Sequence, residues 1–150
     1  MALTQVQGGM IGSLPTGSVI QVVNTTTTTP ATTASTSYVN FSPLNTTITP
    51  KFATSKILVI AQLMLYSGEN TNYQVTLYRG GSNLGPSNGF AYGYSSAVVN
   101  LACPVTMSYL DSPATTSATT YSVYGKIANG TLYFNNGNCQ LSMTLLEIAA

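Results

Sequence analysis

Few side chains in this sequence could carry catalytic chemistry. The chain has no His, and its side-chain carboxylates are Glu69, Asp111 and Glu147. Without His, neither Ser–His and Cys–His nucleophilic pairs nor His-based metal sites can be built. A glycosidase needs two carboxylates at a defined separation, but each of these three lies in a turn or near the C-terminus. The sequence therefore predicts a protein that is not an enzyme, and a polysaccharide depolymerase with two converging carboxylates remains an alternative.

No residue pattern points to a cofactor or a metal ion. The glycine pairs Gly8-Gly9 and Gly80-Gly81 lack the strand-to-helix context of a phosphate-binding loop. Cys103 and Cys139 lack the close spacing and the His partners of a zinc site. We interpret both cysteines as small apolar residues rather than as a disulfide, and we predict that the protein binds no cofactor and no metal.

The ten tyrosines are the residues best suited to binding. An aromatic face buries the apolar C–H groups of a sugar ring while the phenol hydroxyl forms hydrogen bonds. Tyr92 and Tyr94, at the end of a loop expected from Gly85 onward, are therefore candidate contacts to a glycan receptor. Tyrosine is also a favourable strand residue at subunit interfaces, and that is the simpler interpretation of the tyrosines as a group.

The charge content excludes two classes of partner. The 150 residues include four Lys or Arg and three Asp or Glu, with a net charge of +1 and no basic run. Such a chain has too little positive charge to neutralise phosphates along a duplex or to bind an anionic membrane. The longest apolar run, Ile57–Leu65, is too short to span a bilayer, and the start of the chain has no secretory signal. We predict neither nucleic acid nor a membrane as partner.

The composition predicts an all-β fold. The chain holds 23 Thr, 16 Ser and 12 Asn, which strands and turns accept better than helices do. The segment Tyr73–Arg79 alternates and precedes a Gly-rich turn, as in a hairpin, and Pro104 places the strand within Ala97–Leu110 at a sheet edge or a bulge. An Asn136-Gly137 turn is also expected. From these patterns we predict eight to ten strands, arranged in an antiparallel β-sandwich or jelly roll.

The chain divides into an N-terminal arm, residues 1–17, and a β-sandwich domain, residues 18–150. The arm contains glycines, a proline and scattered apolar residues that follow neither helical nor strand periodicity. Its anchoring side chains are expected to be Leu3, Val6, Met10, Ile11 and Leu14. The low-complexity segment Thr25–Thr36 is expected to be a surface connection and not part of the core.

The segment Lys56–Tyr66 is apolar at both of its alternating sets of positions, which indicates a strand buried on both faces. One set, Ile57, Val59, Ala61, Leu63 and Leu65, would face the core. In a sandwich the other face must meet something else, and another subunit is the natural partner. We therefore predict a homotrimer whose interface includes Leu58, Ile60, Met64 and Tyr66.

Several segments together resemble small virion proteins of tailed bacteriophages, including fibre-tip domains and capsid decoration (cement) proteins. The resemblance spans about residues 17–150 and lies in the order of Gly17–Val23, Ser55–Val59, Val75–Gly80, Leu110–Tyr121 and Leu145–Ile148. It implies trimeric β-sandwich subunits on the outside of a particle, made in the host cytoplasm and held by their N-terminal segment.

Within that family, a tail fibre typically has a docking domain and a rod before its tip, whereas Met1 lies only 17 residues before the β domain here. The resemblance therefore favours a capsid decoration protein over a fibre. Its arm and the Thr25–Thr36 segment would contact the shell of major capsid protein, and the trimer would stabilise that shell. The alternative is a receptor-binding tip, attached to tail proteins, that recognises a host surface glycan.

Overall fold

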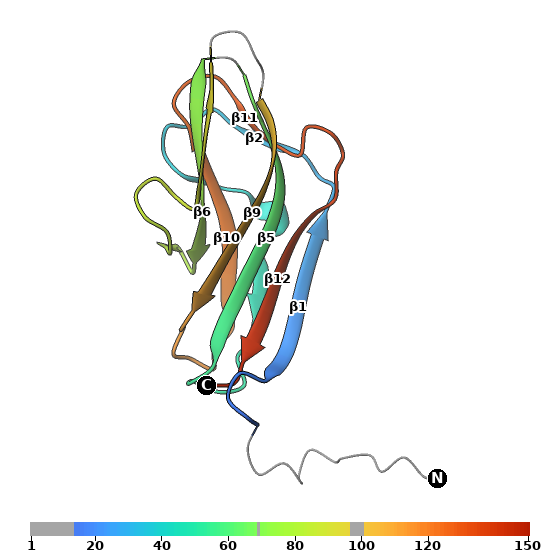
Figure 1. The fold of residues 1–150 in the computed structure, drawn as a ribbon, viewed down its shortest axis with the longest axis vertical. Helices are drawn as coiled ribbons and strands as arrows, with labels where there is room; N and C mark the ends of the chain where they lie inside the picture. Colours follow the sequence, from blue (N-terminus) through green and yellow to red (C-terminus); the bar gives the residue numbers. More distant parts are fainter. Residues whose placement is uncertain (1–13, 69, 97–100) are drawn as a thin grey trace, which may run out of the picture.

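The computed structural model describes residues 14–68, 70–96 and 101–150, which form two antiparallel β-sheets packed face to face (Figure 1). These residues contain twelve strands and one turn of 3₁₀ helix, η1 (Ser42–Leu44). The all-β sandwich predicted from the composition is confirmed. No helix in the described ranges has the length and apolar character needed to cross a membrane.

The first sheet has the order β1, β12, β5, β9, and it lies in front of the second sheet in Figure 1. Beyond the first residues of β12, the short β11 pairs with the last residues of β5, and β2 pairs with β11. The bounds of these strands are β1 (Val19–Thr27), β2 (Ala31–Thr33), β5 (Lys56–Ser67), β9 (Leu101–Asp111), β11 (Leu132–Phe134) and β12 (Leu141–Ile148).

The second sheet is centred on β10 and β6, which pair with each other. The far side of β10 carries β3 and β4, and the far side of β6 carries β7 and β8. The bounds of these strands are β3 (Val39–Asn40), β4 (Thr46–Ile48), β6 (Thr71–Arg79), β7 (Ser82–Asn83), β8 (Ala91–Ser95) and β10 (Thr119–Ile127).

The order of the main strands is that of a jelly roll. Taken along the chain, the eight main strands are β1, β4, β5, β6, β8, β9, β10 and β12. The first of them pairs with the eighth, the second with the seventh, the third with the sixth and the fourth with the fifth. This pairing results when one long antiparallel hairpin is wrapped into two sheets.

The core lies between the sheets and follows the alternation predicted for β5. Its side chains Ile57, Val59, Ala61, Leu63 and Leu65 are at most 4% exposed. Residues of β6 and β10 meet them from the opposite sheet, and the Phe41 and Phe134 rings stack with centroids 4.6 Å apart. Burial of each aliphatic or aromatic side chain stabilises the folded state by about 1.5–3 kcal/mol. This layer is therefore the main stabilising element of the fold.

The prediction that Thr25–Thr36 is a surface connection is wrong for two stretches of the segment, which form strand. Thr25 to Thr27 extend β1 and pair with β12, and Ala31–Thr33 forms β2 beside β11. Threonine is β-branched and favours extended backbone, so the repeated residue forms strand wherever a neighbouring edge offers hydrogen bonds. Thr33 is only 9% exposed.

The predicted turns are right in part. Gly80 and Gly81 have φ of 52° and 92° and close the β6–β7 hairpin, as predicted. The chain also turns at Asn136-Gly137 as predicted, although the positive φ values fall on the flanking Asn135 (65°) and Asn138 (52°). The side-chain amide of Asn135 donates to the Thr28 carbonyl oxygen at 2.7 Å. Pro104 lies in β9, which pairs with β5 alone among the described strands, so its edge position is confirmed.

The first and last strands lie side by side and are hydrogen-bonded beyond their ends. The amide of Gly17 donates to the Ala149 carbonyl oxygen at 2.7 Å, and the amide of Ala149 donates to the Ser18 carbonyl oxygen at 2.9 Å. The start of β1 and the end of β12 are therefore at the same end of the sandwich, the lower end in Figure 1.

Candidate functional site

Asp111 is buried in a cluster that joins the two sheets. Its carboxylate, 5% exposed as a residue, accepts hydrogen bonds from Arg79 Nη1 at 2.8 and 2.9 Å and from the Tyr121 hydroxyl at 2.6 Å. The pKa of Tyr121 is raised above its ordinary value, mainly by burial and next by the hydrogen bond to Asp111. The phenol therefore stays protonated and acts as a donor. The cluster is therefore a cross-link between β9 and the β6–β10 pair.

Glu147 is a second internal carboxylate, with no exposed surface. It accepts hydrogen bonds from the backbone amides of Lys51 (2.7 Å) and Phe52 (3.3 Å) and from Gln21 Nε2 (2.5 Å). Burial alone would raise the pKa of Glu147, but these donors and the nearby Ser55 hydroxyl outweigh it, and the pKa lies below its ordinary value. The ionised side chain therefore holds the loop before β5 against β12.

The two carboxylates lie in one row of the first sheet, because Ile57 pairs with Glu147 on one side and with Asp111 on the other. Both point between the sheets, and their oxygens are engaged by internal donors. Glu69, the third predicted candidate, lies outside the described residues. Within the described ranges no three His, Cys, Asp or Glu side chains come together as a metal site, and Cys103 and Cys139 are free thiols.

The outer face of the first sheet carries an aliphatic band that crosses all four main strands. Val22, Leu146, Leu58 and Leu110 are consecutive partners in the sheet register. Val22 is 57% exposed and Leu110 is 50% exposed, while Leu58 and Leu146 are half-buried. The next row on one side is mostly polar, with Asn24, Thr144, Ile60 and Ser108, and the next row on the other side contains Val19, Ile148 and Lys56. The band is thus a continuous apolar strip that no other part of the described chain covers.

The predicted interface residues fall on this same outer face. Leu58, Ile60, Met64 and Tyr66 alternate with the core residues of β5 and are half-buried. Leu58 belongs to the aliphatic band, and Tyr66 packs edge-on against Tyr133 of β11 with centroids 5.4 Å apart. Of the predicted anchoring residues, Leu14 is 41% exposed, and Leu3, Val6, Met10 and Ile11 lie outside the described residues.

Tyr92 and Tyr94 lie on the outer face of the second sheet, in strand β8 and not in a loop as the sequence suggested. They are 57% and 60% exposed. Gly93, between them, points inward, where a Cβ atom would collide with the ring of Tyr73. Glycine therefore lets the edge strand lie directly on a core tyrosine, which holds both neighbouring tyrosines outward.

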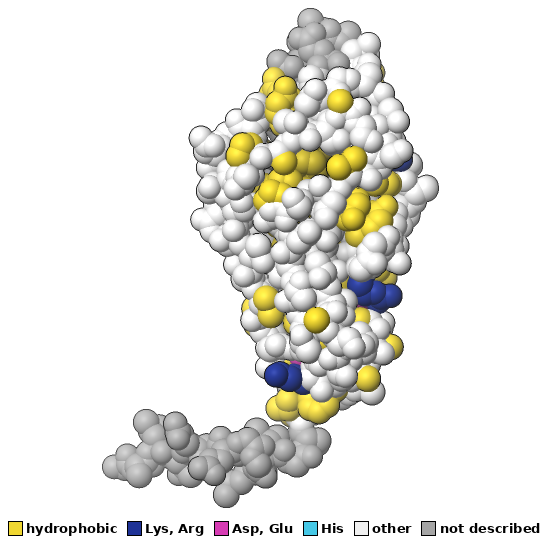
Figure 2. Space-filling view, turned by 180° about the vertical axis from the view of Figure 1, so that it is seen from behind, with side chains coloured by type: hydrophobic (Ala, Val, Ile, Leu, Met, Phe, Trp, Pro, Cys, Tyr) yellow, Lys and Arg dark blue, Asp and Glu magenta, His cyan; other side chains and the backbone are white. Residues whose placement is uncertain are grey.

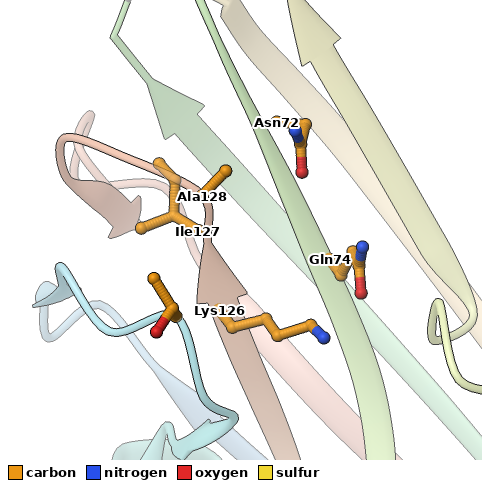
Figure 3. Close-up of a pocket in the computed structure, with 6 residues that line it drawn as sticks. Asn72, Gln74, Lys126, Ile127 and Ala128 are labelled. Carbon is orange, nitrogen blue, oxygen red and sulfur yellow. The ribbon is translucent and has the colours of Figure 1, made fainter.

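Across β6 from the two tyrosines is a shallow hollow of about 170 Å³, lined by Thr36, Asn72, Gln74, Lys126, Ile127 and Ala128. The register places Tyr92 next to Gln74 and Tyr94 next to Asn72, on the side of β6 away from β10. Figure 3 shows the Lys126 side chain extending from β10 toward the strand that carries Gln74. Pockets for drug-sized ligands are larger, about 300–1,000 Å³, so this hollow by itself is too small to enclose such a ligand.

Further tyrosines extend this surface. The Tyr78 and Tyr124 rings stack with centroids 3.8 Å apart, and Tyr38 meets Tyr78 edge-on. The Lys126 ammonium lies 4.5 Å from the centroid of the Tyr38 ring, a cation–π contact. Figure 2, the view from behind, shows hydrophobic side chains gathered in the middle of a face that has few charges. We call this surface the tyrosine face: Tyr38, Asn72, Gln74, Tyr78, Tyr92, Tyr94, Tyr124 and Lys126.

Most of the tyrosine face was not predicted as a site. Asn72 and Gln74 alternate with core residues in β6, and Tyr124 and Lys126 do so in β10. That alternation signals an outward position for each of them. Their grouping depends on the register between β10, β6 and β8, which period-two patterns do not specify.

Comparison with known proteins leaves the chain without an assigned family. No protein-family model matches the sequence, and no curated protein matches it significantly. A chain in the structure of infectious bursal disease virus, Gx strain, is 11% identical with a TM-score of 0.43, and the match covers 100% of this chain and 42% of that chain.

A chain in the structure of the Gt strain of the same virus is also 11% identical, with a TM-score of 0.42 and coverage of 89% and 39%. The present chain thus spans about two fifths of the length of the chains it matches. At these values neither match assigns a family or a function.

Proposed function

We propose that this protein is a structural component of a tailed-phage virion, a capsid decoration protein that binds the outer shell and forms a trimer there. Its N-terminal arm, residues 1–17, attaches it to the major capsid protein. By burying surface on several shell subunits at once, the trimer stabilises the assembled shell. It is made in the host cytoplasm and has no catalytic activity, in keeping with the internal roles of Asp111 and Glu147.

The aliphatic band on the first sheet carries this proposal. A continuous apolar strip with two half-exposed members is costly in water, and burial against another subunit removes that cost. Each fully buried Val or Leu contributes about 1.5–3 kcal/mol. The strip crosses the four main strands of the first sheet and contains no charged side chain, as is typical of the centre of a permanent interface.

The interface is tested by measuring the mass of the purified protein in solution with light scattering after size exclusion. We expect three times the 15.7 kDa chain mass. Val22→Asp and Leu110→Asp place a charge in the band and should yield monomers with unchanged circular dichroism. Ala118→Asp, which adds the same charge to an exposed loop, is the control and should remain a trimer. A monomeric unmodified chain would contradict the proposal.

The location is tested by immunogold electron microscopy of purified particles, with antibody raised against the recombinant protein. Label over the head supports a decoration protein, and deletion of residues 1–13 should then release it and weaken the shell. Label confined to the tail would overturn the decoration role. It would favour the second candidate function, a receptor-binding tip, which the exposure of Tyr92 and Tyr94 supports.

A further inference from the structure

We propose that the tyrosine face binds an acidic carbohydrate, with a sugar ring against Tyr92 and Tyr94 and its carboxylate directed to Lys126. This binding would be a function additional to shell attachment. The proposal names the ligand class for the second candidate function, the receptor-binding tip. It is also compatible with a place on the capsid, because the tyrosine face and the aliphatic band lie on different sheets.

The first observation is a pair of aromatic side chains held in the open. Tyr92 and Tyr94 are 57% and 60% exposed, and two residues apart on a strand they are spaced by about 7 Å. Gly93 between them allows close packing of β8 on the Tyr73 ring, which directs both tyrosines outward. Aromatic rings exposed in this way can bury the apolar face of a sugar.

The second observation is the polar chemistry beside that platform. Asn72 and Gln74 pair with Tyr94 and Tyr92 across the β6–β8 register, and their amides line the hollow. An amide side chain both donates and accepts, which matches sugar hydroxyls, since these also do both. The single hydrogen of the Tyr38 hydroxyl is shared between the Gln74 carbonyl oxygen and the Ser87 carbonyl oxygen, each at 3.3 Å, and the Gln74 NH₂ group donates to no other described residue.

The third observation is the charge. Lys126 also lines the hollow, and its ammonium rests over the Tyr38 ring. Burial, with the neighbouring Tyr78, raises the pKa of Tyr38, so that ring stays neutral at physiological pH. Among the described residues the salt bridge is Arg79–Asp111, and Lys126 has no carboxylate partner there. A positive charge at the edge of a hydroxyl-binding hollow selects a sugar that carries a carboxylate.

The test is isothermal titration calorimetry of the full-length protein at low ionic strength with three probes. Trigalacturonic acid and sialyllactose carry carboxylates, and maltotriose is neutral. We expect both acidic probes to bind and maltotriose to bind at least tenfold more weakly. Tyr92→Ala and Tyr94→Ala should each weaken the acidic probes about fivefold or more, and Lys126→Gln should reduce them to the level of maltotriose.

Two matched controls are available on other surfaces. Phe52→Ala removes an aromatic side chain that is 54% exposed, and Lys56→Gln removes a charge from the first sheet. Neither substitution should change the affinities for the acidic probes. The proposal is overturned if no acidic probe binds, if maltotriose binds equally, or if the controls weaken binding as much as the tyrosine-face variants. These outcomes are independent of the immunogold result, because particle location is not measured here.

Discussion

The ionised Glu147 side chain is predicted to make the stability of the sandwich depend on pH, and Glu147→Gln isolates that effect. The wild-type carboxylate accepts three hydrogen bonds from Gln21, Lys51 and Phe52. Hydrogen bonds to a charged acceptor contribute about 1.5–3 kcal/mol each. A glutamine keeps one acceptor oxygen and turns an NH₂ group toward another donor, so we expect a loss of about 1.5–2 kcal/mol at pH 7.

The direction of the pH effect follows from the lowered pKa of Glu147 in the folded state. A carboxylate with a depressed folded pKa contributes its full stabilisation above the unfolded pKa, about 4.3. That stabilisation is lost as the pH falls through the folded pKa. The difference in unfolding free energy between wild type and Glu147→Gln should therefore be constant from pH 7 to about pH 5 and shrink below about pH 4.

The assay is urea denaturation at pH 7, 5 and 3, at one protein concentration, followed by far-UV circular dichroism. Lys126→Gln is the control, because it removes a charge from the other sheet and leaves the Glu147 donors in place. Equal stability of wild type and Glu147→Gln at pH 7 would refute the assignment of these hydrogen bonds. A difference that is as large at pH 3 as at pH 7 would refute the role of ionisation.

Two further substitutions test the packing and the cross-link between the sheets. Gly93→Ala should destabilise the protein by about 2 kcal/mol in urea denaturation, because its Cβ would collide with the Tyr73 ring; wild-type stability would contradict the close packing of β8. Asp111→Ala should lower the unfolding free energy by about 3–5 kcal/mol, because it leaves the Arg79 guanidinium and the buried Tyr121 hydroxyl without their acceptor. The double variant Asp111→Ala/Tyr121→Phe should recover part of that loss, because it also removes the hydroxyl.

The sequence predicts the core strands well, because their signal is local. In β5 the alternating residues Ile57 to Leu65 are all apolar, and they are the buried set. The alternation of β6 around Tyr73 and Val75 is equally clear. The all-β class and the edge position of Pro104 are predicted in a similar way, from properties of individual residues. Proline, for example, has no amide donor for a second neighbouring strand.

The errors arise where distant partners decide the conformation. The Thr25–Thr33 region looks like a loop in isolation, and becomes strand because β12 and β11 present free backbone groups to it. Strand β8 contains a glycine, which lowers strand propensity, and only the Tyr73 ring beneath explains why Gly93 belongs there. Similarly, no local pattern indicates that Glu147 and Asp111 flank the same residue, Ile57.

The hydrogen bonds that join Gly17 and Ser18 to Ala149 have a mechanical consequence. Strands β1 and β12 are antiparallel neighbours whose outer ends meet at one pole of the sandwich. Their ladder bonds lie perpendicular to the strands, so a force applied between residues 17 and 149 would open them one at a time, like a zipper, at low load. A force applied between Thr27 and Ala149 would instead load the ladder along its length, and all its bonds would have to yield together. The domain is thus expected to be weak to tension between its two termini and strong to shear along its first strand.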